Sequence, residues 1–190
     1  MRWAAGLLGK AGKKITQRDM ELLLTKTGTD MGNLRMELEK LISYTEGRDV
    51  VTAEDIEEIC TTQTTNRIFD MVRAVTEKNQ KRALELYYDL LTLKEPPMRI
   101  LFLLAKQYRQ LLLAKQFAAA GLAQTEIASK LGVPGFVVRN ITTCARAYTI
   151  SELEQAVKDF VDAEESVKTG RLEDKLSVEL LIIKYSSKVK

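Results

Sequence analysis

The chain has 190 residues, of which 45% are hydrophobic and 29% are charged, while glycine (10) and proline (3) are scarce. This composition is typical of a helical protein with one ordinary domain or two small ones. Histidine is absent, which excludes His-based acid–base catalysis, Ser–His and Cys–His nucleophile pairs and the usual zinc enzyme sites. The formal net charge of +3 is too small to indicate a nucleic-acid-binding protein by itself.

The apolar runs, such as residues 100–104, are much shorter than the roughly 20 residues that a membrane helix requires. The first ten residues contain neither the apolar run nor the cleavage site of a signal peptide. We therefore expect a cytoplasmic protein without a membrane partner. Cys60 and Cys144 lie far apart in the sequence, and in a reducing compartment such cysteines are expected to be buried thiols.

Helical periodicity in nearly every segment predicts an all-α fold. In the first 60 residues, Thr16 is expected to cap a helix that ends before Gly28, and a second helix should cover residues 30–44. Thr52, followed by acidic residues in the first turn, should start a short third helix. These segments predict a small helical domain over residues 1–60.

Residues 61–66 read TTQTTN, a polar run that favours neither a helix nor an apolar stripe. This composition predicts a linker between the first domain and a second one over residues 67–190.

The second part should begin with two helices, around Ile68 and Ala83, before a break at residues 96–97. Pro97 suits the first turn of a long helix that runs towards Gly121. Two short helices should flank Gly132. Ser151 and Glu154 should then form a capping box that opens the next helix, and a last helix should cover residues 173–185.

Candidate catalytic motifs have simple structural interpretations. Residues 6–11 read GLLGKA, which is two residues short of a phosphate-binding loop, lacks its hydroxyl and follows no strand. Acidic residues at 54–58 suit a helix N-terminus. We therefore predict no catalytic residue, no cofactor-binding residue, no metal ligand and no cofactor.

Residues 125–139, TEIASKLGVPGFVVR, are typical of a helix-turn-helix. A recognition helix reads bases with its first residues, and here Pro134 and Gly135 offer no side-chain donor or acceptor. Arg139 and Asn140 are the candidate DNA contacts of this segment. A helix-turn-helix DNA-binding regulator is therefore the alternative function.

Several stretches resemble the delta subunit of bacterial DNA polymerase III, in the order found in that family. Residues 30–41 read DMGNLRMELEKL, similar to the family's L-x-x-E-L-E-K-L helix, and VTAEDI follows at 51–56. Residues 66–71, NRIFDM, are similar to the start of the family's last domain. The match continues through QYR at 107–109, EIASKLGV at 126–133 and the segment 162–170. A His-Pro pair, usual in the family, is replaced by Pro134-Gly135.

The resemblance implies a non-catalytic piece of a clamp loader of the AAA+ family, with a small helical lid-like domain and a helical-bundle collar domain. In that family the collar packs with the collars of other subunits in DNA replication. The resemblance does not extend to the family's ATPase-like N-terminal domain, which carries the sliding-clamp contacts, so we expect none of those contacts among these 190 residues. Primed DNA would thus be an indirect partner. The chain would be a subunit of a nucleotidyltransferase complex but would have no active site of its own.

The richest apolar stripes outside the first domain run from Leu101 to Leu112 and from Leu176 to Ile183. Both are candidate partner surfaces of the collar. Leu176, Leu180 and Ile183 are the candidate subunit-interface residues.

Overall fold

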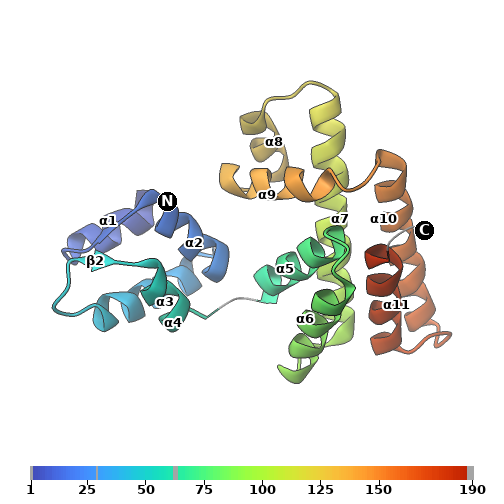
Figure 1. Ribbon diagram of the computed structural model, residues 1–190, viewed down its shortest axis with the longest axis horizontal. Helices are drawn as coiled ribbons and strands as arrows, with labels where there is room; N and C mark the ends of the chain where they lie inside the picture. The colour runs from blue at the N-terminus through green and yellow to red at the C-terminus, as the bar shows by residue number, and fades with distance from the viewer. Residues whose placement is uncertain (1, 29, 62–63, 188–190) are drawn as a thin grey trace. The chain divides into compact units, whose positions relative to one another are not determined.

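A computed structural model of the chain (Figure 1) describes residues 2–28, 30–61 and 64–187. The chain forms two compact units, Met1–Asn66 and Arg67–Lys190. Regular structure in the described ranges is helical apart from two strands of two residues each. The all-α prediction is therefore confirmed.

The first unit is built from short helices that surround one apolar core. In chain order it contains α1 (Arg2–Lys10), β1 (Lys14–Ile15), α2 (Gln17–Thr27), α3 (Met31–Tyr44), β2 (Val50–Val51) and α4 (Ala53–Ile59). Leu8, Leu38 and Ile56 are fully buried in this core. No separate helix was predicted for the residues that form α1, although they were placed in the first domain; α1 includes Gly6 and Gly9 and buries Ala4 and Leu8.

The two strands tie the start of the first unit to the loop that precedes α4. Lys14 lies opposite Val50 and Ile15 opposite Val51 in a parallel pair. The Nζ of Lys13 donates hydrogen bonds to the carbonyl oxygens of Thr45 (2.7 Å) and Arg48 (2.6 Å), just beyond α3. The lysine thereby caps carbonyls beyond the C-terminal end of α3, and the Thr45 oxygen also accepts the backbone N–H of Arg48 (3.0 Å).

Helix starts in the first unit follow the side chains that sequence reasoning identified. The hydroxyl of Thr16 accepts a hydrogen bond from the backbone N–H of Asp19, as predicted. Thr52 and Asp55 form a reciprocal capping box at the start of α4. Such caps stabilise a helix by about 1 kcal/mol each because they satisfy otherwise unpaired N–H groups.

Glu37, inside the segment that resembles the delta-subunit motif, is buried, with 5% of its surface exposed. Its carboxylate accepts a hydrogen bond from the backbone N–H of Thr61 (3.2 Å) and lies 2.6 Å from the Nζ of Lys40. A buried carboxylate requires such partners. Glu37 therefore fixes the chain where it leaves α4.

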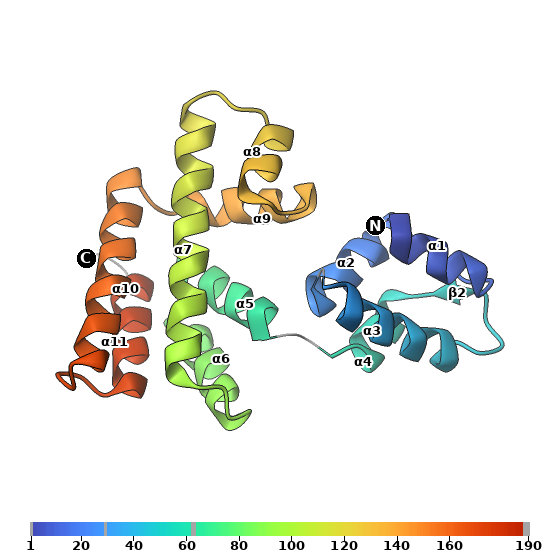
Figure 2. The ribbon, with the colours of Figure 1, turned by 180° about the vertical axis from the view of Figure 1, so that it is seen from behind.

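The second unit is a bundle arranged around one long helix. It contains α5 (Thr64–Thr76), which begins just ahead of the unit boundary, α6 (Gln80–Thr92), α7 (Pro97–Ala119), α8 (Gln124–Leu131), α9 (Gly135–Ala145), α10 (Ile150–Lys168) and α11 (Asp174–Ser186). α7 lies centrally, with α8 and α9 on one side and α10 and α11 on the other (Figures 1 and 2). Pro97 occupies the first turn of α7, as predicted.

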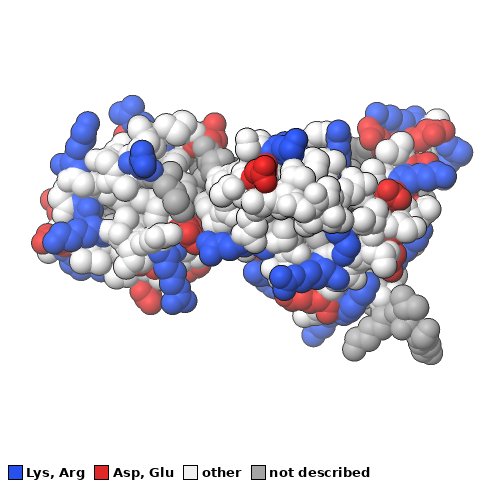
Figure 3. Space-filling model, turned by 90° about the horizontal axis from the view of Figure 1, so that it is seen from above, with Lys and Arg blue, Asp and Glu red and all other residues white. Residues whose placement is uncertain are grey.

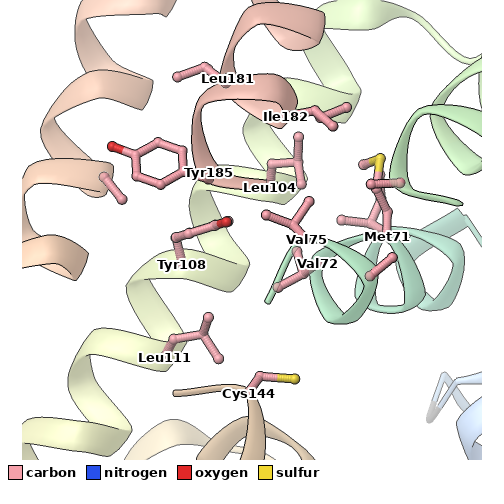
Figure 4. Packing of buried hydrophobic residues seen from close by; sticks show 14 of the residues in the cluster. Met71, Val72, Val75, Leu104, Tyr108, Leu111, Cys144, Leu181, Ile182 and Tyr185 are labelled. Carbon is pink, nitrogen blue, oxygen red and sulfur yellow. The ribbon is translucent and has the colours of Figure 1, made fainter. Parts of the chain in front are cut away.

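The core of the second unit joins residues that are far apart in the sequence (Figure 4). Val72 and Val75 of α5 pack with Leu104 of α7 and Ile182 of α11, all nearly inaccessible to solvent. The ring of Tyr108 lies 5.0 Å from that of Phe160 between centroids. The Tyr108 and Tyr148 hydroxyls are hydrogen bonded at 3.2 Å, which satisfies two buried polar groups.

Two boundary predictions differ from the structure. α5 begins at Thr64, inside residues 61–66, which were predicted to be a linker; residues 62–63 lie outside the described residues. Threonine and asparagine are favoured both in loops and at the N-cap position of helices, so composition could not separate a linker from a helix start. The capping box of α10 is Thr149 with Glu152, two residues before the pair predicted at Ser151 and Glu154.

Candidate subunit interface

α11 is held in place by polar contacts near both of its ends. The hydroxyl of Tyr87 on α6 donates to the carbonyl oxygen of Lys175 (2.9 Å), and the Nζ of Lys78 donates to that of Tyr185 (2.9 Å). The Tyr185 hydroxyl donates to the carboxylate of Asp159 on α10, which also lies 2.5 Å from the Nζ of Lys184. α11 is therefore a fixed part of the bundle.

The inner face of α11 completes the core. Val178 is fully buried, and Leu181 and Ile182 are 7% and 2% exposed. Burial and the hydrogen bond to Asp159 both raise the pKa of Tyr185. Burial opposes ionisation of Asp159, but the hydrogen bonds from Lys184 and Tyr185 outweigh it and lower the pKa of this carboxyl.

The opposite face of α11 carries the three residues predicted for a subunit interface. Leu176 and Leu180 are 42% and 47% exposed, and Ile183 is half-buried. Their spacing of four and three residues places them on one side of the helix. A helix that is apolar on both faces is normally covered on both, so this outer face is the candidate interface.

Tyr88 of α6 adds an aromatic ring near this face. Its side chain is 47% exposed, and a hydrogen bond to Glu179 of α11 raises its pKa. Glu179 lies between Leu176 and Leu180 in the sequence. Tyrosine is frequent at the energetic centres of protein interfaces. We call Tyr88, Leu176, Leu180 and Ile183 the α11 face.

The other predicted stripe is not a surface. Leu101, Leu104 and Leu111 are at most 2% exposed because they form the α7 side of the core. The prediction that this stripe meets a partner was wrong for these residues. Periodicity identifies an apolar face but does not distinguish a core contact from a partner contact.

The predicted helix-turn-helix segment corresponds to α8 and α9, joined through Gly132 in the left-handed conformation (φ 65°). Arg139 and Asn140 are exposed on α9. The hydroxyls of Thr142 and Thr143 both donate hydrogen bonds to the carbonyl oxygen of Arg139 in the same helix (3.0 and 2.9 Å). DNA contact by Arg139 and Asn140 stays a prediction.

The structure gives the remaining candidates structural roles. Gly6 and Gly9 lie within α1 and not in a phosphate-binding loop. Burial, with the neighbouring Glu37, raises the pKa of Cys60 to about 12, and burial also raises the pKa of Cys144, so both thiols stay protonated. Across the described ranges, no cluster of three or more acidic or cysteine side chains could hold a metal ion. None of the described helices is both long and apolar enough to cross a membrane.

In the view of Figure 3, lysine and arginine are interspersed with acidic side chains on each unit, and uncharged areas lie between them. The fold and the α11 face together define a helical module with an exposed apolar helix face.

The chain belongs to the family of DNA polymerase III delta subunits: the model of the family's C-terminal domain matches residues 65–185. The chain is 27% identical over 171 residues to the DNA polymerase III subunit delta of Bacillus subtilis. It is 23% identical over 123 residues to the probable subunit delta of Aquifex aeolicus. These matches confirm the resemblance identified from the sequence, and the family match includes α8 and α9.

The solved structure of the Bacillus subtilis DNA clamp loader delta protein is similar over 98% of this chain, with a TM-score of 0.86 and 25% identity. The chain covers 55% of that structure. It spans 49% of the length of the curated Bacillus protein and 35% of that of the Aquifex protein. The structural likeness thus covers both units of this chain, which spans about half the length of the Bacillus protein and about a third of the Aquifex protein.

Proposed function

We propose that this chain is a non-catalytic, assembling part of a clamp loader in DNA replication, and that the second unit acts as a collar that packs with other subunits through the α11 face. The observation that carries the proposal is that α11 is apolar on both sides while only one side is buried. Its outer leucines, 42% and 47% exposed, offer a partner helix the kind of stripe that helices bury against each other.

The proposed mechanism is positional. Lys78, Tyr87 and Asp159 hold α11 against α6 and α10, so force on the α11 face is transmitted to the core of the second unit. ATP hydrolysis would belong to neighbouring subunits, and primed DNA would be an indirect partner. Contacts with the sliding clamp would belong to the part of the relatives that this chain does not span. The first unit would act as the lid-like domain.

The experiment is co-elution of this chain with the ATPase subunits of the clamp loader from the same organism, beside a matched trial with the sliding clamp alone. We expect a complex with the ATPase subunits and none with the clamp. A variant with Leu176→Glu and Leu180→Glu should lose the complex, because a buried charge without a partner is strongly unfavourable at an interface.

Met36→Glu is the matched control, because Met36 is 59% exposed on α3 of the first unit. Circular dichroism should show that all variants stay helical. Failure of the unmodified chain to join the ATPase subunits, or equal binding by the double variant, contradicts the proposal. Tight binding to the isolated clamp contradicts the assigned division of roles.

A further inference from the structure

A second exposed surface lies on α7. Unlike the α11 face, it carries basic side chains around its apolar residue. Arg99, Phe102, Lys106 and Arg109 are all exposed, and spacings of three, four and three residues place them on one side of the helix. Over this span α7 rises about 15 Å. We call these four residues the α7 face.

Phe102 is the centre of the α7 face. Its side chain is 63% exposed, the highest value among the exposed large hydrophobic residues in the described part of the chain. Leu103 and Ala105, one and three residues further along α7, are partly buried and pack against the core. The ring therefore projects from a helix that is packed against the core. A partner that covered the ring would remove apolar surface from water, and little conformational entropy of α7 would be lost.

The charged residues of α7 itself are all basic. α7 carries four basic residues and no acidic residue between Pro97 and Ala119. Arg99 is paired with Glu95 (3.1 Å), and Lys115 donates to the carbonyl oxygen of Ala145 (2.9 Å). Lys106 and Arg109, in contrast, have no ion-pair or hydrogen-bond partner among the described residues. The α7 face thus presents two unpaired cations one and two turns beyond an exposed ring.

We propose that the α7 face binds an acidic protein segment that places an apolar side chain on Phe102 and carboxylates on Lys106 and Arg109. Charge complementarity selects an acidic partner, and the helical spacing of the ring and the cations fits a short helix with an apolar anchor. This proposal does not rest on the function assigned to the α11 face.

Single-stranded nucleic acid fits the α7 face less well. Proteins that bind such strands stack successive bases on several aromatic rings along a basic groove. Here Phe102 is the exposed aromatic residue of α7, and Tyr88, the other exposed aromatic residue described in the second unit, is hydrogen bonded to Glu179. One ring beside two unpaired cations favours a peptide over a strand of nucleotides.

The test begins with a random peptide library displayed on phage and selected against the whole chain. We expect enriched peptides to carry several acidic residues around a large apolar one. One such peptide, labelled with fluorescein, is then titrated by fluorescence anisotropy. Phe102→Ala and Arg109→Ala should each weaken its binding at least fivefold, roughly the effect of losing about 1 kcal/mol at an interface centre.

Met36→Ala and Arg18→Ala are the matched controls: both positions are exposed in the first unit, and both variants should bind the peptide like the unmodified chain. Circular dichroism checks that each variant is folded. Enrichment of peptides without acidic residues, no enrichment at all, or unchanged binding by Phe102→Ala overturns the proposal. A thymidine oligonucleotide that binds more tightly than the peptide, through the same residues, would instead make the α7 face a nucleic-acid site.

Discussion

Leu180 and Leu181 are adjacent in α11 and lie about 100° apart around the helix, with exposures of 47% and 7%. Replacing each with alanine removes the same atoms in two environments. For Leu181→Ala the lost burial and the cavity left in the core should lower the free energy of unfolding by about 3 kcal/mol. Leu180→Ala removes a side chain that is about half in water and leaves no enclosed cavity, so its cost should be about 1 kcal/mol or less.

Urea unfolding measures this difference. For a slope of about 2 kcal/mol per molar urea, Leu181→Ala should lower the midpoint of the second unit by about 1.5 M and Leu180→Ala by about 0.5 M or less. Circular dichroism follows both units. The chain has one tryptophan, and it is Trp3 in the first unit, so tryptophan fluorescence should report an unchanged midpoint for that unit in both variants.

For association with the ATPase subunits, Leu180→Ala should have the larger effect of the two variants. Leu180→Ala should weaken co-elution about fivefold or more while the protein stays folded, because truncating a residue at the centre of an interface commonly costs over about 1 kcal/mol. Equal losses of stability in the two variants would refute the assignment of inner and outer faces. Full association by Leu180→Ala would refute the role of the outer face.

Two further predictions concern stability. The pKa of Asp159 is lowered by Lys184 and Tyr185, and that of Asp55 by Thr52 and Arg48, against the opposing effect of burial in both cases. Carboxyls with a folded pKa below the unfolded value stabilise the protein above a pH of about 4, and this contribution is lost as the pH falls through the folded pKa. Acid unfolding followed by circular dichroism should therefore show that the stability of Asp159→Asn falls less with decreasing pH than that of the unmodified chain. The same pH profile in both proteins would contradict this prediction. A chain of residues 64–190 should fold alone and keep the urea midpoint of the second unit, because each unit has its own core; a shift of over about 1 M would show that the units depend on each other.

Much of the fold could be predicted because local rules and tertiary packing agree. Thr16, Thr52 and Pro97 begin helices as their chemistry dictates. The start of α10 was placed two residues late because Thr149 and Ser151 each precede a glutamate by three residues. Local sequence does not choose between two equivalent capping boxes; in the structure Thr149 and Glu152 form the box, and Ser151 lies in the first turn of α10.

The candidate surfaces were only partly predictable. The leucines of α7 and of α11 have similar periodicity, yet Leu104 is buried and Leu180 is exposed. Deciding between them requires the positions of neighbouring helices, which a single sequence does not contain. Phe102 was overlooked for the related reason that it is one apolar residue within an apolar run, ILFLL at 100–104. Its exposure becomes evident when α10 and α11 are seen to cover other sides of α7.

The place of α11 in the chain has a consequence for protein synthesis. Val178, Leu181, Ile182 and Tyr185 belong to the core of the second unit, and they follow every other helix of that unit in the sequence. While a ribosome is still translating residues 174–186, α5 and α6 lack one of the surfaces against which they pack. The first unit can fold as soon as it emerges. The second unit cannot complete its core until α11 has been synthesised. Until then, the apolar side chains that α11 covers would be exposed and could bind a chaperone.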